Sequence, residues 1–140
     1  ISDGKWYQPT RVAEAIKDSF GETEIMFIPE FPTAQNNDNV LNTATGYDRV
    51  VFVTFCETGA YVGTDCLTRR MESLIEAVDI SGKLEAIVHF GNPLALNSVR
   101  KPDRVILGYN APDSQKYAIM ALAGEIEAKG KNPYARLYQR

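Results

Sequence analysis

The chain has 140 residues, of which 44% are hydrophobic and 24% are charged, and its formal net charge is −3. A chain of this length folds as one domain whose core needs no disulfide or metal. The acidic balance gives no electrostatic reason to expect nucleic acid as a partner. No apolar run approaches the roughly 18 residues of a membrane span. Because the chain has a single histidine, a multi-histidine metal site within it is excluded.

The N-terminal third combines a helical pattern with a strand-like run. Between Pro9 and Phe20 apolar residues recur every four positions, which predicts a helix, and Gly21 is suited to its end. The run Glu24–Pro29 predicts a short buried strand. The polar stretch Glu30–Asp48 is rich in Asn and Thr and shows no clear period, so we interpret it as a surface excursion or a functional loop.

Three further strands are predicted at Arg49–Phe55, Leu84–Phe90 and Asp103–Tyr109. Arg49–Phe55 is the strongest, because its apolar run suits a strand that is covered on both faces of a parallel sheet. Helices are expected between these strands and after the last one.

The first of these later helices is expected to begin after Thr64 as its N-cap and to end at Ser81-Gly82. One apolar face is predicted for it, made of Leu67, Met71, Leu74, Ile75 and Val78. A last helix is predicted within Ala111–Ala128, with a core face that includes Tyr117, Met120 and Ile126.

This alternation predicts an α/β fold, a mainly parallel sheet flanked by helices in a three-layer α/β/α sandwich, as a single domain over residues 1–140. Ligands of such sheets bind outside the carboxyl ends of the strands. The chain begins without Met and without the basic and apolar regions of a signal peptide, so we expect a piece of a longer chain.

The junction Gly91-Asn92-Pro93 follows one of the predicted strands. Glycine permits a sharp turn, asparagine is a preferred N-cap, and proline suits the first helical position. We therefore predict a capped strand-to-helix turn. The sequence contains neither of the glycine-rich phosphate motifs, which disfavours a nucleotide site, and we expect no cofactor.

Candidate site residues are those near predicted strand ends. Glu57 is the best-placed carboxylate, and His89, Asn92 and Asn110 are candidates for substrate binding. Each has an ordinary alternative, such as a solvated loop carboxylate for Glu57 and a satisfied interior side chain for His89. To act as a general base, His89 would need a nucleophile or an orienting carboxylate nearby. Asp65 and Asp113 are candidates for that carboxylate, but nothing in the sequence places either of them beside His89. The aromatic residues Trp6, Tyr61 and Tyr109 are candidates for stacking on sugars, and Cys56 and Cys66 are expected to be free thiols.

One ordered set of segments resembles a known family. The strand "VVFVTF" is followed by a helix ending in "LIEAV", by "SGKLEAIVHFGNPLAL" and by "PDRVILGYNAPDSQKYAIMALAGEIEAKGKNP". This order, over Val50–Pro133, resembles the C-terminal α/β sandwich domain of glycoside hydrolase family 3, in the branch of β-N-acetylhexosaminidases and β-glucosidases. Gly91-Asn92-Pro93, Gly124-Glu125 and Gly130–Pro133 match its motifs, although Asn132 stands where the family usually has Leu.

The resemblance implies that this chain is the C-terminal domain of a longer retaining β-glycosidase and packs on an N-terminal (β/α)8 barrel of the same chain. The nucleophile would be an aspartate of that barrel, so these 140 residues alone are expected to be inactive. In many β-glucosidases of the family a glutamate of this second domain acts as the acid/base, and Glu57 is the candidate here. The implied ligand is a carbohydrate.

Two other interpretations stay open. The chain could be a free-standing α/β binding or interaction module without catalysis, because no complete catalytic constellation is evident in the sequence. A flavodoxin-like nucleotide binder also fits the pattern of elements, but it lacks the glycine-rich loop.

Overall fold

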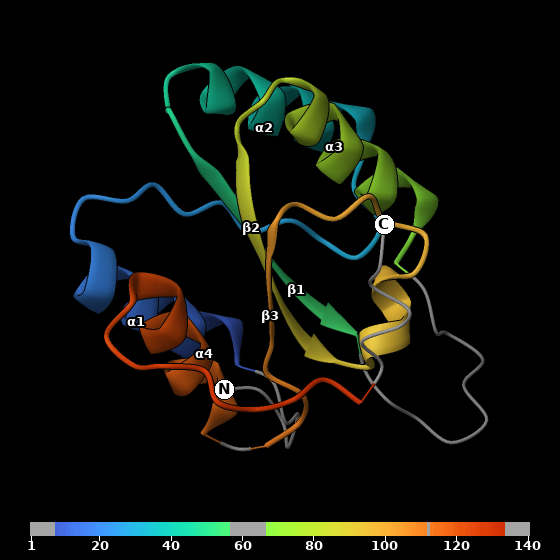
Figure 1. Cartoon of the computed structure of the whole chain (residues 1–140). Coiled ribbons are helices and arrows are strands. Elements are labelled where there is room, and N and C mark those ends of the chain that lie inside the picture. The colour runs from blue at the N-terminus through green and yellow to red at the C-terminus, as the bar shows by residue number, and fades with distance from the viewer. Residues whose placement is uncertain (1–7, 57–66, 112, 134–140) are drawn as a thin grey trace.

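The computed structural model describes residues 8–56, 67–111 and 113–133. Its sheet consists of three parallel strands in the order β1-β2-β3, which are β1 (Val50–Cys56), β2 (Leu84–Gly91) and β3 (Arg104–Leu107). All three coincide with predicted strands to within a few residues at their ends. The predicted parallel sheet flanked by helices is confirmed (Figure 1).

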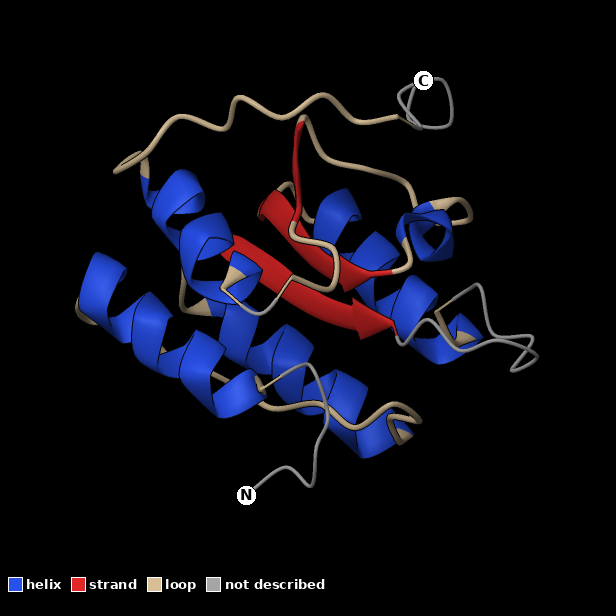
Figure 2. Ribbon diagram, turned by 90° about the horizontal axis from the view of Figure 1, so that it is seen from below, coloured by secondary structure: helices blue, strands red, loops and turns tan. Residues whose placement is uncertain are grey.

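Helices cover both faces of this sheet, as Figures 1 and 2 show. They are α1 (Pro9–Phe20), α2 (Ala34–Thr45), α3 (Arg69–Ile80) and α4 (Ser114–Ala123), with a 3-10 helix, η1, at Pro93–Leu96. Helix α1 packs on α4 over one face, and α2 packs beside α3 over the other. The fold is therefore the expected three-layer arrangement.

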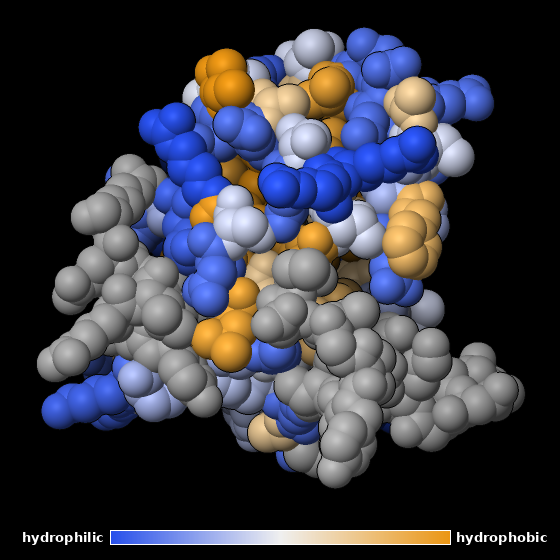
Figure 3. All heavy atoms as spheres, turned by 90° about the vertical axis from the view of Figure 1, so that its right-hand side faces the viewer, coloured by the Kyte–Doolittle hydropathy of each residue, from blue (hydrophilic) through white to orange (hydrophobic). Residues whose placement is uncertain are grey.

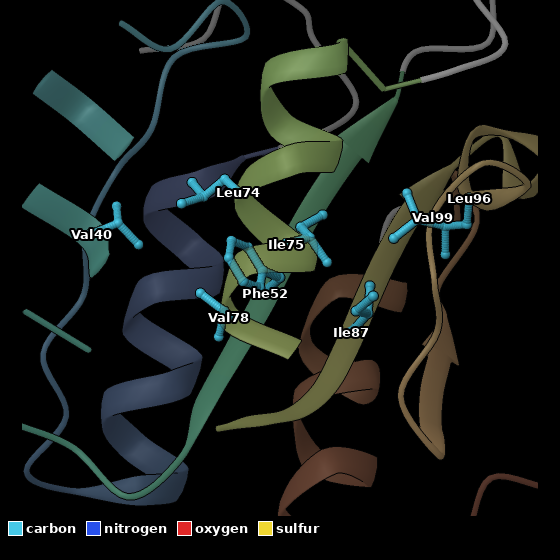
Figure 4. Packing of buried hydrophobic residues seen from close by; sticks show 8 residues of the cluster. All are labelled: Val40, Phe52, Leu74, Ile75, Val78, Ile87, Leu96 and Val99. Carbon is cyan, nitrogen blue, oxygen red and sulfur yellow. The ribbon is translucent and has the colours of Figure 1, made fainter. Parts of the chain in front are cut away.

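The core between the sheet and the α2/α3 layer is closed by aliphatic side chains around one aromatic ring (Figure 4). Its buried members are Val40, Phe52, Leu74, Ile75, Val78, Ile87, Leu96 and Val99. Met71 is partly buried against this cluster, so the predicted apolar face of α3 is confirmed for Met71, Leu74, Ile75 and Val78. Leu67 packs on the same cluster but lies before the helix begins. The start of α3 differs from the prediction, because Thr68 is its N-cap; Thr64 lies outside the described residues.

The predicted core face of α4 is wrong at Tyr117 and Ile126, while Met120 is half-buried. Tyr117 is 54% exposed, and Ile126 lies beyond the helix, which ends where Gly124 adopts a left-handed conformation. The buried face consists of Gln115, Ala118, Ile119 and Leu122. A buried tyrosine would need a partner for its hydroxyl, whereas the alanine and the aliphatic side chains of this face pack into the cluster that α1 shares with β2.

The predicted strand Glu24–Pro29 is also wrong, because this segment is not a strand and pairs with none of the strands in the described residues. Met26 and Phe27 are 39% and 64% exposed. Side chains hold both of its ends, since the Tyr47 hydroxyl donates to the Glu24 carboxylate at 2.6 Å and Thr68 donates to the Glu30 carbonyl at 3.0 Å.

The stretch Glu30–Asp48, interpreted as a surface excursion or loop, contains helix α2. A capping box starts this helix, in which Thr33 accepts from the Asn36 N–H and the Asn36 side chain accepts from the Thr33 N–H. Its buried side chains, Val40 and Ala44, are four residues apart. Because most residues around them are polar, the apolar stripe is too narrow to predict a helix from the sequence pattern.

Candidate functional site at the carboxyl edge of the sheet

The carboxyl ends of the three parallel strands meet at one edge of the sheet. Cys56 lies in register with Gly91, and His89 lies in register with Leu107. Of the predicted site residues, His89, Asn92 and Asn110 lie at or just beyond this edge. Glu57 directly follows β1 but lies outside the described residues. This edge is the candidate functional site.

The Gly91-Asn92-Pro93 junction is the predicted capped turn, although the helix that follows is a short 3-10 helix. Gly91 has φ +98°, and its N–H donates to the Tyr109 carbonyl at 3.1 Å. The Asn92 N–H donates to the Cys56 carbonyl at 3.1 Å, while its side chain accepts from the Leu94 N–H at 3.0 Å. The N–H groups of this turn are thus used within the protein, which is unlike a phosphate-binding loop.

His89 joins this junction to the neighbouring strand. Its side chain is almost fully buried, with Nε2 2.8 Å from the Asn92 carbonyl oxygen and Nδ1 2.7 Å from the Thr54 hydroxyl. A carbonyl only accepts, so Nε2 carries the proton and, in the neutral ring, Nδ1 accepts from Thr54. Burial lowers the pKa of His89 below its ordinary value, and the bond to Asn92 opposes this only in part. His89 therefore orients the junction as a neutral, satisfied side chain.

Tyr109 and Asn110 form the exposed part of the edge. The Tyr109 side chain is 36% exposed, and its backbone has φ +52°, an uncommon conformation for an aromatic residue. Two backbone bonds hold this turn, from Gly91 to Tyr109 and from Gly108 to the His89 carbonyl. The Tyr109 hydroxyl lies 3.4 Å from Asn132 Oδ1, so the segment after α4 returns to the strand ends.

Asn132 is not among the predicted site residues. It lies 23 positions after Tyr109, and no local pattern indicates that the segment after α4 folds back to the sheet. Together the edge presents an exposed aromatic ring and amide side chains. Aromatic rings stack on the apolar faces of sugars and amides hydrogen-bond to hydroxyls, so this set is suited to a neutral polyhydroxy ligand.

A hollow lies between the start of α3 and the chain after η1. It is lined by Arg69, Glu72, Ser73, Glu76, Ser98, Val99 and Arg100. Glu72 contacts Arg69 at 3.6 Å and Ser98, while Arg100 pairs with Asp79 at 3.1 Å. On the side of the molecule shown in Figure 3, hydrophobic residues are interrupted by hydrophilic ones. Three of the four charged side chains that line the hollow, Arg69, Glu72 and Arg100, are paired within the chain, so the carboxyl edge remains the better candidate.

Comparison of the chain with known proteins found no match among family models, curated proteins or solved structures. Within the described residues, no helix is both long and apolar enough to span a membrane. The same residues contain no cluster of three or more His, Cys, Asp or Glu side chains that could hold a metal ion. The assignment of function therefore rests on the sequence resemblance and on the geometry of the carboxyl edge.

Proposed function

We propose that this chain is the accessory C-terminal domain of a family 3 glycoside hydrolase, of the β-N-acetylhexosaminidase or β-glucosidase type. It packs on a catalytic (β/α)8 barrel and lines one side of the sugar site with its strand-end loops. The barrel supplies the nucleophile. Glu57, which follows β1, is the candidate acid/base of this domain.

The observation that carries this proposal is the chemistry of the carboxyl edge. Tyr109 projects a partly exposed ring there, beside Asn110 and close to Asn132. The neighbouring histidine is buried, neutral and bonded through both ring nitrogens. Such an edge can hold a sugar by stacking and hydrogen bonding, while the reacting groups come from elsewhere. This division of labour agrees with what the sequence resemblance implies.

The test uses the native protein that contains this chain. Its intact mass should exceed the 15.6 kDa of these residues by that of a barrel, roughly 250 residues or more. It should hydrolyse a synthetic β-N-acetylglucosaminide or β-glucoside. Tyr109→Ala should raise KM about tenfold, because one stacking contact is lost. Tyr117→Ala, which changes an exposed tyrosine of α4, should leave KM unchanged. A native protein that hydrolyses neither glycoside would contradict the proposal.

A free-standing sugar-binding module is the second candidate, because this chain alone supplies Tyr109, Asn110 and Asn132. The two candidates predict different masses. A native mass near 15.6 kDa, together with sugar-induced shifts of the Tyr109 and Asn110 amide resonances, would favour the module and exclude the barrel partner.

A further inference from the structure

Tyr109, the exposed aromatic residue of the carboxyl edge, has a backbone conformation that other residues must hold. Its φ of +52° lies in the left-handed region, which a bulky side chain rarely adopts. The Gly108 N–H, just before it, donates to the His89 carbonyl at 2.8 Å. The Tyr109 carbonyl accepts from the Gly91 N–H at 3.1 Å. The direction of the Tyr109 ring therefore depends on how β2 ends.

The end of β2 depends in turn on the Gly91-Asn92-Pro93 junction. Gly91 is the last residue of the strand and has φ +98°, so the chain turns there. The Asn92 N–H donates to the Cys56 carbonyl, and the Asn92 carbonyl accepts from the Ala95 N–H, both at 3.1 Å. These two bonds tie the junction to β1 and to η1, but not to β2 itself.

The His89 side chain supplies the bond to β2. Its Nε2 donates to the Asn92 carbonyl at 2.8 Å and so spans Gly91. The ring is almost fully buried, and the Thr54 hydroxyl fixes its other nitrogen at 2.7 Å. An imidazole that is bonded through both nitrogens inside the core keeps one orientation. It is therefore a rigid support for the residue whose N–H holds Tyr109.

We propose that His89 is a positioning residue of the sugar site. Its bond to the Asn92 carbonyl keeps Gly91 against Tyr109, and this keeps the Tyr109 ring in the orientation that stacks on a sugar. The inference rests on the proposed function, in which Tyr109 is the stacking residue. Because His89 is only 1% exposed, it acts through Tyr109 and not by contact with the ligand.

Two substitutions separate the two bonds of the imidazole. The amide of glutamine extends about as far from the backbone as Nε2, so His89→Gln can still donate to the Asn92 carbonyl. The amide of asparagine extends only about as far as Nδ1, so His89→Asn can bond to Thr54 but not to Asn92. Each variant replaces the buried imidazole by one amide, so a purely structural role predicts similar effects for both.

The first measurement is NMR of the native protein that contains this chain, labelled at tyrosine. A strong NOE between the amide proton and Hα of Tyr109 indicates a positive φ, because the two protons are closest in that conformation. The NOE should be strong in the wild type and in His89→Gln, and weak in His89→Asn. A strong NOE in His89→Asn would overturn the inference, whether or not the protein acts on sugars.

The second measurement is hydrolysis of the synthetic β-glycoside. His89→Asn should raise KM about fivefold and leave kcat within about twofold, because it removes binding and not chemistry. His89→Gln should keep the wild-type KM. In a Tyr109→Ala background, His89→Asn should not raise KM further, because the ring that it positions is gone. Equal KM values for the two His89 variants would contradict the role of the Asn92 bond.

Val78→Ala is the control for lost stability. Val78 is buried in the α2/α3 core, near the end of α3 that leads into the start of β2. This variant should be less stable than the wild type and keep its KM. An unchanged KM in Tyr109→Ala would contradict the stacking role in the proposed function, while the NOE would still test the link from His89 to Tyr109.

If His89→Asn does not fold, hydrogen exchange of the wild type in low urea decides the matter. The His89 Nε2 proton and the Gly91 amide proton should become exposed in the same opening, with equal free energies and equal dependence on urea. Separate openings for the two protons would overturn the inference, because the junction would then hold Gly91 without the imidazole.

Discussion

Thr54 and His89 are register partners on adjacent strands, and the Thr54 hydroxyl lies 2.7 Å from His89 Nδ1. The second nitrogen of the same imidazole holds the Asn92 carbonyl. This connection fixes the end of β1, the end of β2 and the turn that leaves it. The hydrogen bonds from Thr54 to His89 and from His89 to Asn92 thus hold the carboxyl edge in place, in addition to the contacts of the exposed loops.

Removing the hydrogen bonds that join Thr54, His89 and Asn92 should destabilise the protein. His89→Leu removes the imidazole partner of the Thr54 hydroxyl and leaves the Asn92 carbonyl with the Ala95 N–H alone, so the free energy of unfolding should fall by about 2 to 5 kcal/mol. Thr54→Val should cost about 1 to 2 kcal/mol. In urea unfolding, the double variant should lose less than the sum of the two single changes, because the residues are in direct contact. Additive losses would show that the 2.7 Å contact contributes no coupling.

The same histidine should make stability depend on pH. Its pKa is lowered by burial from 6.5, so the unfolded chain binds the proton more readily than the folded one. The stabilisation is complete above about pH 6.5 and is lost as the pH falls from there through the lowered folded-state pKa, by at most about 1.4 kcal/mol per pH unit. Since the chain has one histidine, His89→Gln should remove this slope between pH 6.5 and 5. Urea midpoints across that range provide the measurement, and an unchanged slope in the variant would assign it to another group.

Lys83 is expected to stabilise the end of α2. Its ammonium donates to the carbonyls of Ala44, Thr45 and Tyr47 at 2.8, 3.0 and 2.8 Å. Ala44 and Thr45 lie in the last turn of α2 and Tyr47 lies just after it, and a cation is favourable at the C-terminus of a helix. Lys83→Met should lower the free energy of unfolding by about 2 to 3 kcal/mol.

The control for Lys83 is Lys129→Met, because the Lys129 side chain is 81% exposed and its ion pair with the exposed Glu127 spans 3.8 Å. It should change stability by no more than about 0.5 kcal/mol. Thermal unfolding of both variants side by side tests the difference, and equal losses would contradict the capping role of Lys83.

Gly108 is expected to tolerate no side chain. A Cβ at this position would lie 2.2 Å from Phe90 Cε1. The Phe90 ring is fully buried and stacks on Phe55 with 5.2 Å between ring centroids, so it has no room to move. Gly108→Ala should cost about 3 kcal/mol or more. At Gly130 no atom lies within 4 Å of an added Cβ, and Gly130→Ala should be nearly neutral. Chemical denaturation of the two variants distinguishes a steric effect from a general intolerance of alanine.

Local patterns predicted the elements whose apolar residues are continuous or regularly spaced. The run Val50–Cys56, the apolar face of α3 and the Gly91-Asn92-Pro93 turn all follow from short-range physical chemistry. The buried role of His89 could be predicted only as one of two alternatives. Its partner Thr54 is 35 residues away, and that contact depends on the strand register.

The sequence by itself therefore determined the α/β class, the parallel strands and the capped turn, because continuous apolar runs, helical spacing and N-cap chemistry act over a few residues. Tertiary structure decided which face of α4 is buried, that a polar stretch forms α2, and that Glu24–Pro29 lies unpaired beyond β1. It also brought Asn132 to Tyr109. These outcomes depend on what packs against each segment, and the packing partners are distant in the sequence.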